Sequence, residues 1–542
     1  MTRSQAGEPL YSDNARRPNI LLIVADQMAA PALPMYGNTV VRAPNMERLA
    51  AAGSTFDSAY CVSPLCAPSR FSLLTGKLCS HIGAYDNASE LPATVPTIAH
   101  YLRFLGYRTC LSGKMHFIGP DQLHGYETRL TTEIYSAGLE LALAIWPENA
   151  QLATQLGFPP DWGGAVGAVV NAGPCERSLQ IDYDDEVQFH AVRQIYDFAR
   201  DDDQRPFFLT VSFTQPHDPF TCAQAYWDLY SDEEVGLPRI PRPDDEAMHP
   251  VEKSLLEFTG FWKRETVTEA EIVAARRAYY GMISDVDARI GELLEALRRT
   301  GQLDDTLVIL TADHGEMLGE RGQWYKRNFF EPSVRVPLVF CGPLGEAAPS
   351  RIGLHVSQLD LLPTLFSVAG GRADNFVGSP DGRDLSPLLA GNPLEAENRV
   401  VSELLCDGVT GPNMMIREDR WKYWYSHGNP PMLFDLDADP DEQLNLAGES
   451  DHHDTLASFE VQLQERWNVE SLKSAVLESQ RARMLVCHAH KIGQPPIWDY
   501  AVPGDPLARY MRPETEFWQS IEDRARLPKV KTVSKALRET EE

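Results

Sequence analysis

Three continuous apolar runs of strand length constrain the fold of this chain more than any other feature. They are Asn19–Ala25, Phe207–Phe213 and Thr306–Leu310. An unbroken apolar run is typical of a central strand in a parallel sheet, which is buried on both faces. Helical patterns separate the runs, and the clearest begins at the capping box of Thr268 and Glu271. Strands that alternate with helices predict an α/β fold, with a large, mostly parallel sheet and helices on both faces.

The pattern changes near residue 400. Residues 413–416 and 421–425 have strand patterns and are joined by a polar turn, which predicts a hairpin. A helical pattern follows over residues 455–490. A chain of 542 residues is long enough to bury one large core and a smaller second one. We therefore predict a large α/β domain over residues 1–400 and a smaller α+β domain over residues 401–490.

The last segment, residues 491–542, is polar and contains several prolines. It also contains large apolar side chains, at Trp498, Tyr500, Tyr510, Met511 and Trp518. A disordered tail seldom has so many aromatic residues. We predict an extended arm that packs on its own subunit or on a neighbour.

Charge and cysteine usage exclude several classes of partner and site. The net charge of −28 argues against nucleic acid and anionic membrane surfaces, since both attract basic patches. No apolar run is long enough to cross a membrane, and the first residues lack the apolar core of a secretory signal. The nine cysteines have no framework spacing and no CxxC pair, which indicates a reducing compartment and disfavours a cysteine-bound zinc.

Polar residues follow each predicted strand directly. Asp26 and Gln27 follow the first, Lys114 and His116 follow the strand at residues 107–112, and the others are His217, Asp313 and His314. Open α/β sheets bind ligands at the carboxyl ends of their strands. The Asp and Gln oxygens suit one divalent cation, Ca²⁺ or Mg²⁺, and a His makes Mn²⁺ acceptable. The alternative to a functional site is that these residues are structural, with the Asp in a turn at the end of its strand and the His within the core.

The run Cys66-Ala67-Pro68-Ser69-Arg70 precedes an apolar helical segment. Ser69 is a predicted N-cap, so Cys66 would stand at a helix N-terminus, where anions are favoured. Arg70 adds a permanent planar cation. A buried structural cysteine in a proline turn is the alternative.

This run resembles the sulfatase signature Cys-x-Pro-Ser-Arg with its Leu-Thr-Gly continuation. The resemblance covers nearly the whole chain, through Asp-Gln at 26–27, Gly-Lys-Met-His at 113–116, Gln-Pro-His-Asp-Pro at 215–219, Asp-His-Gly-Glu at 313–316 and Leu-Phe-Asp-Leu at 433–436. It implies the alkaline-phosphatase-like fold. It also implies that a maturation enzyme oxidises Cys66 to formylglycine, whose hydrate attacks sulfur through one hydroxyl and releases sulfate through the other.

The resemblance further implies roles for the strand-end residues. One Ca²⁺-type ion would be held by Asp26, Gln27, Asp313, His314 and the modified Cys66. Fixed positive charge around the sulfate oxygens would come from Arg70, Lys114 and Lys326. Either His217 or His116 would be the general acid that protonates the leaving alcohol.

More narrowly, the chain resembles the choline sulfatases. The similar stretches are Tyr85-Asp86-Asn87 and residues 112–125, 129–132, 182–187, 324–331 and 498–499. This resemblance implies choline O-sulfate as substrate, a cytoplasmic location and a homo-oligomer, dimeric or tetrameric. It also implies that the arm at residues 491–542 helps to build the oligomer and closes the active site. Glu403 and Asp499 would face the choline cation, with Trp498 as an aromatic wall and Asn87 also in the substrate site.

One stretch departs from the choline sulfatase pattern. After Tyr135, where a tryptophan is expected, residues 137–142 contain no aromatic residue, and the next one is Trp146. Another small or aryl sulfate ester therefore stays open as the substrate. A phosphonate monoester or phosphodiester hydrolase of the same superfamily is the nearest competing function, and a non-catalytic anion-binding relative is a remote one. A two-zinc phosphatase would need further His and Asp ligands that are not evident.

Overall fold

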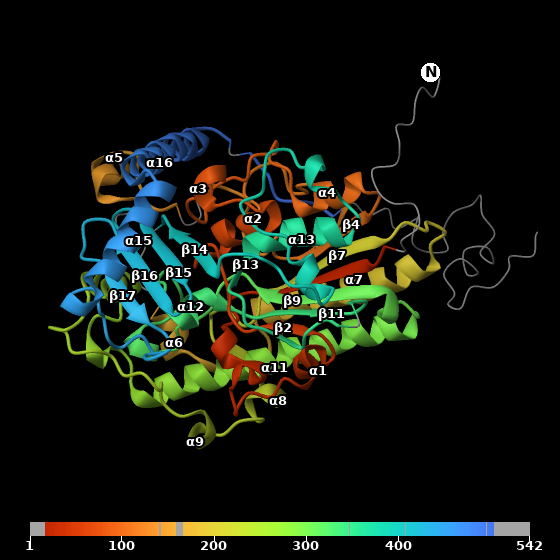
Figure 1. Cartoon of the computed structure of the whole chain (residues 1–542), viewed down its shortest axis with the longest axis horizontal. Coiled ribbons are helices and arrows are strands. Elements are labelled where there is room, and N and C mark those ends of the chain that lie inside the picture. The colour runs from red at the N-terminus through yellow and green to blue at the C-terminus, as the bar shows by residue number, and fades with distance from the viewer. Residues whose placement is uncertain are drawn as a thin grey trace, which may run out of the picture.

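The computed structural model describes residues 17–502, apart from residues 140–142, 159–165, 346, 407 and 495. A sheet of eight strands forms its centre, in the order β12-β2-β11-β9-β1-β7-β4-β5 (Figure 1). Their bounds are β12 Arg351–Ile352, β2 Ser54–Phe56, β11 Leu338–Cys341, β9 Thr306–Ala312, β1 Asn19–Ala25, β7 Phe207–Phe213, β4 Arg108–Gly113 and β5 Thr128–Arg129.

The predicted mostly parallel sheet is confirmed. β4, β7, β1 and β9 are consecutive parallel neighbours, whereas β11 runs antiparallel to both β9 and β2. Every residue of β7 and β9 is buried, as are the last six residues of β1. Their sequences are continuously apolar because helices cover both faces of these strands.

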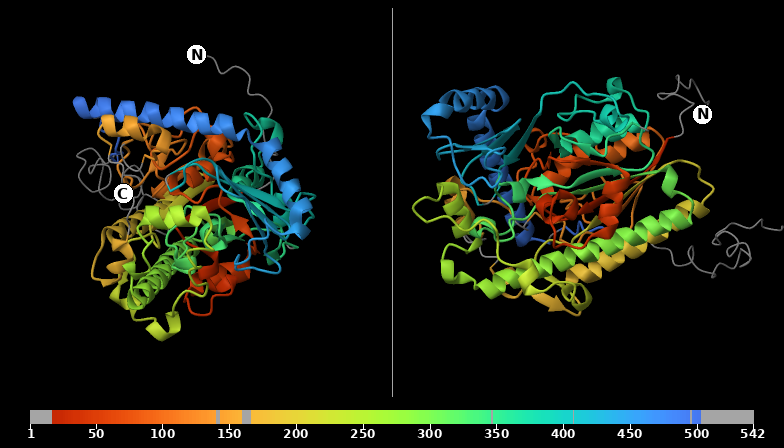
Figure 2. Two further views of the ribbon diagram at one scale, coloured as in Figure 1. Left: turned by 90° about the vertical axis from the view of Figure 1, so that its left-hand side faces the viewer. Right: turned by 60° about the horizontal axis from the view of Figure 1, so that its bottom comes forward.

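Helices cover both faces of this sheet, as predicted. The helices α2 (Cys66–Thr75), α4 (Ile98–Phe104) and α13 (Leu361–Val368) lie above it in Figure 1, and α1 (Pro44–Ala52) and α11 (Glu269–Arg299) lie below. α7 (Leu179–Arg200) packs beside α11 and against β4 and β7 (Figure 2). The capping box is present at the start of α11: Glu271 N donates to Thr268 Oγ1, and Thr268 N donates to Glu271 Oε2. The apolar stripe of α11 is fully buried, at Ile283, Val286, Ile290, Leu293 and Leu297.

A second sheet follows, with four antiparallel strands in sequence order: β14 (Arg399–Leu404), β15 (Asn413–Glu418), β16 (Trp421–Ser426) and β17 (Met432–Asp435). The predicted hairpin is β15–β16. Two helices then replace the single helical region that the sequence predicted, α15 (His453–Arg466) and α16 (Val469–Ile492). They separate at Asn468, whose side chain accepts a hydrogen bond from Ser471 N and so caps α16 instead of continuing α15.

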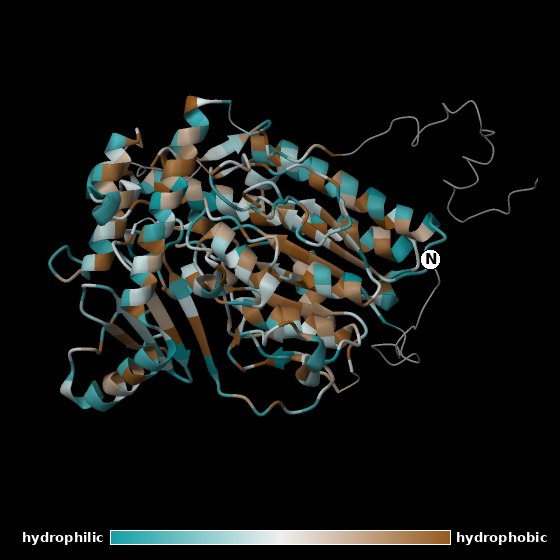
Figure 3. Ribbon diagram, turned by 90° about the horizontal axis from the view of Figure 1, so that it is seen from above, coloured by the Kyte–Doolittle hydropathy of each residue, from teal (hydrophilic) through white to brown (hydrophobic). Residues whose placement is uncertain are grey.

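Shorter elements fill the connections. One small sheet consists of β3 (Ala59–Tyr60), β10 (Arg335–Val336) and β13 (Val356–Ser357), and another consists of β6 (Gly173–Cys175) and β8 (Thr221–Ala223). The short helices are α3 Cys79–Ile82, α5 Ala150–Gln155, α6 Gly167–Val170, α8 Gln224–Trp227, α9 Asp232–Val235, α10 Pro250–Thr259, α12 Glu331–Val334 and α14 Ser386–Leu389. Figure 3 shows apolar residues concentrated on the central strands. Among the described residues, no helix is both long and apolar enough to cross a membrane. All nine cysteines lie within the described residues, and none is joined to another in a disulfide.

The beginning of the predicted arm lies against its own subunit. Trp498 packs on an apolar cluster that includes Ile118 and Phe158. Asp499 Oδ1 accepts a hydrogen bond from Ala137 N at 3.2 Å, and the Arg129 guanidinium lies 5.7 Å from the centre of the Tyr500 ring. The other aromatic residues of the arm, Tyr510 and Trp518, and Met511 lie outside the described residues.

Candidate active site

The polar residues that follow the predicted strands converge at one edge of the central sheet. The register pairs Ala25, the last residue of β1, with Ala312 at the end of β9, so Asp26 and Asp313 are neighbours. Phe213, at the end of β7, is the other partner of Ala25, and Ser212 of β7 pairs with Gly113 of β4. The parallel arrangement therefore brings residues far apart in sequence to the same point.

Cys66 is the first residue of α2, and it is buried rather than exposed. Ser69 is not the N-cap that the sequence predicted, because the helix begins three residues earlier. Pro68 fits within its first turn, where backbone N–H groups have no intrahelical acceptor. The single proton of the Ser69 hydroxyl instead has two acceptors within reach, Gln358 Oε1 at 2.7 Å and the Asp313 carbonyl. Asn87 Oδ1 accepts from Ala67 N at 2.9 Å and so satisfies one of the free donors at this helix end.

Four buried side chains, Asp26, Cys66, Asp313 and His314, offer ligand atoms that all lie within 4.8 Å of one another. Cys66 Sγ is 3.2 Å from His314 Nε2. Asp26 Oδ1 accepts no hydrogen bond from any described residue, and Arg70 Nη2 lies 3.6 Å from it. A buried carboxylate oxygen without a hydrogen bond is costly unless a cation compensates it. The donor set and this oxygen, which accepts no hydrogen bond, fit a divalent cation.

Gln27 has a positive φ of 65°, a conformation that non-glycine residues adopt mainly at constrained sites. Its backbone N–H donates to Asp313 Oδ1 at 2.9 Å. Its side-chain oxygen accepts a hydrogen bond from Lys326 Nζ, and its amide nitrogen donates to Glu316 and Asp218. The chain thus places Gln27 beside the cluster, with its side-chain amide oriented by three partners.

Three buried cations surround the cluster. Lys114 Nζ forms an ion pair with Asp26, and Arg70 Nε donates to Asp313 Oδ2 at 2.8 Å. Arg70 also donates to the Lys114 carbonyl and the Ser212 hydroxyl. Lys326 Nζ lies 2.8 Å from His217 Nε2. Three buried cations therefore lie beside the carboxylates of the site, although the protein carries a net charge of −28.

These cations change the ionisation of the anionic groups. Burial raises the pKa of the Cys66 thiol, but Lys114, Lys326 and His314 lower it by more, so the pKa lies well below its usual value. Burial likewise raises the pKa of Asp26, but Lys114, His217 and Arg70 together lower it by more, so this pKa also lies below its usual value. The site stabilises negative charge at the position of Cys66.

Two histidines flank the cluster. His217 lies in the loop after β7, where its Nδ1 is 2.7 Å from the Asp218 carbonyl. Burial lowers the pKa of His217, but the carboxylates of Asp218 and Asp26 raise it by more, so the net shift is upward. His116 has a positive φ of 61°, and its ring centre lies 5.3 Å from that of Tyr135.

Several residues that the sequence analysis did not select support this site. The Glu133 carboxylate accepts hydrogen bonds from Met115 N and His116 N, at 3.1 and 3.0 Å, and is paired with Arg129. The Tyr135 ring lies 4.6 Å from Lys114 Nζ. Glu316, the last residue of Asp-His-Gly-Glu, binds Gln27, and burial raises its pKa to about 7. Glu316 could have been predicted from its place in the Asp-His-Gly-Glu motif. The local sequence contains no pattern that predicts the partners of Glu133.

Glu403 has other partners than those the sequence predicted. Its carboxylate is fully buried and accepts hydrogen bonds from Ser80 N at 2.8 Å, from the Ser80 hydroxyl at 2.6 Å and from Trp467 Nε1 at 2.6 Å. Both oxygens are therefore engaged by the protein itself. The prediction that Glu403 faces a substrate cation has no support in these contacts.

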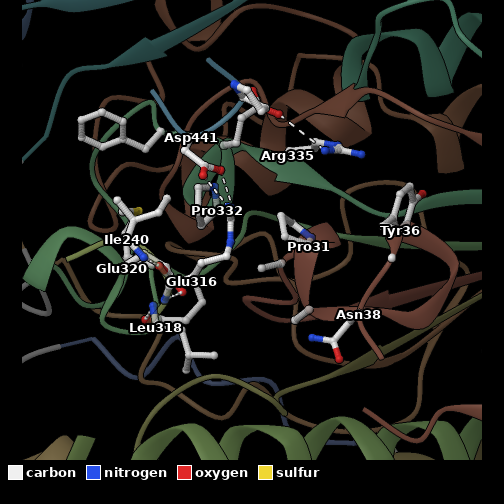
Figure 4. A pocket seen from close by; sticks show the side chains of 18 of the residues that line it. Pro31, Tyr36, Asn38, Ile240, Glu316, Leu318, Glu320, Pro332, Arg335 and Asp441 are labelled. Carbon is white, nitrogen blue, oxygen red and sulfur yellow. Dashed lines mark hydrogen bonds and ion pairs between the residues drawn. The ribbon is translucent and has the colours of Figure 1, made fainter. Parts of the chain in front are cut away.

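A separate cavity of about 670 Å³ extends from Glu316 to Asp441, which follows the four-stranded sheet β14–β17 (Figure 4). Glu316 lines it, so it approaches the back of Gln27. Among the arginines that line it, Arg239 forms an ion pair with Asp441, Arg276 with Glu320, and Arg321 with Glu252.

Comparisons with known proteins agree with this geometry. The family model "Sulfatase" matches residues 18–371, "N-sulphoglucosamine sulphohydrolase, C-terminal" matches residues 319–468, and "Choline sulfatase enzyme C terminal" matches residues 474–527. A choline-sulfatase of Rhizobium meliloti (strain 1021) is 40% identical over 95% of this chain and 99% of its own, and an arylsulfatase of Clostridium perfringens is 27% identical over 81% and 92%.

Among solved structures, the phosphonate monoester hydrolase of Agrobacterium radiobacter superposes with a TM-score of 0.66 at 26% identity, over 85% of this chain and 96% of its own. This neighbour has the same overall fold. The first family model covers more than half of the chain, and the choline-sulfatase matches almost all of it. The chain therefore belongs to the sulfatase family of sulfuric ester hydrolases.

Proposed function

We propose that this protein hydrolyses the sulfate ester of a small cationic alcohol, choline O-sulfate or a close analogue. The observation that carries the proposal is the buried cluster of Asp26, Asp313 and His314 around Cys66, within a ring of cations. The 40% identity to a choline-sulfatase supports the alcohol. A maturation enzyme would convert Cys66 to formylglycine, and we expect the enzyme to be a cytoplasmic homo-oligomer.

Asp26, Gln27, Asp313 and His314 would hold one divalent cation, Ca²⁺ before Mg²⁺ or Mn²⁺, because the donors are mostly oxygens. When bound, the cation supplies positive charge that acidifies a hydroxyl at residue 66 and offsets the charge of sulfate. Formylglycine at residue 66 supplies a geminal diol, which both attacks sulfur and can expel sulfate again. The Cys66 Sγ atom stands in for one of these hydroxyl oxygens.

The remaining steps belong to side chains of this chain. Lys114 lies beside Asp26 and would face the sulfate oxygens with Lys326, while Arg70 holds Asp313 in position through its 2.8 Å contact. Lys326 Nζ donates to His217 Nε2 at 2.8 Å; an anionic substrate oxygen would replace this contact and accept from both side chains once the imidazole carries its second proton. His217 would then deliver its Nε2 proton to the leaving alcohol, and His116 is the second candidate for this step.

The arm would supply recognition of the alcohol. Asp499 is exposed and accepts a hydrogen bond from the backbone of Ala137. Ala137 belongs to the stretch that lacks the expected tryptophan. Trp498 precedes Asp499 and packs on the neighbouring apolar cluster. A carboxylate and an aromatic face together suit a quaternary ammonium, which has no hydrogen-bond donor, and contribute about 2 kcal/mol or more. Asn87 lies next to Cys66 at the start of α2 and would border the sulfate side of the substrate.

We expect kcat/KM for choline sulfate to exceed that for an uncharged aryl sulfate in protein whose Cys66 is fully converted. Asp499→Asn should lower kcat/KM for choline sulfate by about 10-fold and leave the aryl ester unchanged, since only the former has a cation to bind. The measurement is steady-state kinetics on both esters. Asp454→Asn, which makes the same charge change on α15, is the matched control.

A wild-type preference for the aryl ester, unaltered by Asp499→Asn, would refute the cation pocket and leave the sulfatase assignment in place. A second candidate function is phosphonate monoester or phosphodiester hydrolysis, which the similarity to the Agrobacterium hydrolase favours. Matched sulfate and phosphonate monoesters of one alcohol would separate the two functions by their relative kcat/KM.

A further inference from the structure

We infer that the first turns of α7 position the general acid of the reaction: Gln180 and Asp184 hold the loop Thr214–Asp218 and thereby orient His217. Neither residue touches the Cys66 cluster, so both are positioning residues. The inference rests on the proposed function, because it assigns His217 the role of proton donor to the leaving alcohol.

Helix α7 packs against β7, the strand that ends at this loop (Figures 1 and 2). Ser178 caps the helix by accepting a hydrogen bond from Ile181 N at 3.2 Å, which fixes where the helix starts. Gln180 and Asp184 are four residues apart, so they lie on the same face of α7. Both are buried, with exposed fractions of 6% and 0%.

Asp184 holds the beginning of the loop. Its Oδ1 accepts from Thr214 N at 2.8 Å and from the Thr214 hydroxyl at 3.0 Å, and its Oδ2 accepts from Gln215 N at 3.0 Å. A buried carboxylate is expensive, and here burial raises the pKa of Asp184 to about 7 despite these hydrogen bonds. The contacts satisfy backbone donors that would otherwise be buried without acceptors.

Gln180 holds the end of the loop. Its Nε2 donates to the His217 carbonyl at 2.7 Å and to the Asp218 carbonyl at 2.8 Å. These two acceptors determine the orientation of the amide, because a flipped amide would point its oxygen at both carbonyls. Two donors from one side chain thus fix two consecutive peptide groups.

The position of the Asp218 carbonyl determines the orientation of the His217 imidazole. The Asp218 carbonyl that accepts from Gln180 also lies 2.7 Å from His217 Nδ1, so Nδ1 carries a proton and donates to it. Nε2 is then directed toward Lys326 and the cluster. A general acid must lie within hydrogen-bond distance of the atom it protonates, so a loop that can move would lower the rate of proton transfer.

Such a role predicts a loss that depends on the leaving group. An alkyl alcohol is a poor leaving group and needs a proton as the ester bond breaks, whereas an electron-poor phenol leaves readily as its anion. Loss of a positioned acid therefore slows the alkyl ester much more than the aryl ester. A change that only damaged the fold would slow both esters equally.

The experiment uses the full-length, converted enzyme with choline sulfate and 4-nitrophenyl sulfate. Gln180→Met removes both donors at nearly constant volume. We expect kcat/KM for choline sulfate to fall by about 30-fold or more and that for the aryl ester by less than about 3-fold. Gln188→Met is the matched control, because Gln188 is on the same helix but accepts from Arg289 instead of binding the loop; it should leave both values unchanged.

A double-mutant cycle with His217→Ala tests whether Gln180 affects the rate through His217. If Gln180 acts through His217, adding Gln180→Met to His217→Ala should cost almost nothing further for choline sulfate. Asp184→Asn places an amide NH₂ against Gln215 N–H and should give the same ester-selective loss, so it is the second variant should Gln180→Met fail to fold.

Equal losses on both esters, or full additivity with His217→Ala, would overturn the positioning role while leaving the sulfatase function intact. A converted wild-type enzyme that hydrolysed neither ester would instead refute the proposed function itself, and the inference with it.

Discussion

Replacing Cys66 by alanine is expected to lower sulfate ester turnover by about 10⁴-fold or more, because the variant has no side chain that can become the nucleophile. Cys66 is buried at the start of α2, 3.2 Å from His314, and Lys114 and Lys326 favour its ionised form. Turnover of the best substrate and intact mass of the wild-type Cys66 peptide are the measurements. Far-UV circular dichroism should be unchanged, because alanine is compatible with a first helical turn.

Cys66→Ser separates loss of the nucleophile from loss of the release step. A serine hydroxyl could attack sulfur but has no second hydroxyl from which sulfate could be expelled. We expect a single turnover that leaves one sulfo group on residue 66, seen by peptide mass spectrometry. Near-normal steady-state turnover in either variant would exclude the formylglycine mechanism.

Asp313→Asn is expected to remove the bound metal and, with it, activity by about 10²-fold or more. Asp313 contributes one of two carboxylates to the cluster, and its Oδ2 also accepts from Arg70 at 2.8 Å. An asparagine lowers the negative charge of the site and turns an NH₂ group either toward the metal or toward Arg70. Elemental analysis of protein purified in parallel with the wild type measures the loss.

Glu316→Gln is the matched control for Asp313→Asn. It makes the same isosteric change three residues later, at a buried carboxylate that contacts Gln27 but is not in the four-residue cluster. The glutamine variant should keep one metal ion per chain, even if its turnover falls. Full metal content in Asp313→Asn, or two zinc ions per wild-type chain, would contradict the proposed site.

Much of the fold could be predicted because the decisive signals are local. A strand buried on both faces is continuously apolar, and α11 has both its capping box and its apolar stripe within its own residues. The β15–β16 hairpin is local too, since Glu418 pairs with Trp421. The division between α15 and α16 was missed, because both segments are helical in pattern and only the cap at Asn468 separates them.

The candidate site was predictable to the extent that strand ends determine it. Asp26, Asp313 and His314 follow buried parallel strands, and such strands place their carboxyl ends together. The signature around Cys66 added the chemistry. What each side chain contacts was not predictable, because the partner usually comes from a distant segment.

The sequence by itself therefore determined the α/β class, the parallel central strands and the residue types that gather at their ends, since periodicity and strand-end position are properties of neighbouring residues. Only the tertiary structure decided the partners. The Glu403 carboxylate accepts hydrogen bonds from Ser80 and Trp467, and the Ser69 hydroxyl contacts Gln358. The loop that contains His217 is hydrogen-bonded to α7 through Gln180. The physical reason is that a buried polar group must be satisfied by whichever complementary group the packing brings within reach, and packing depends on the whole chain.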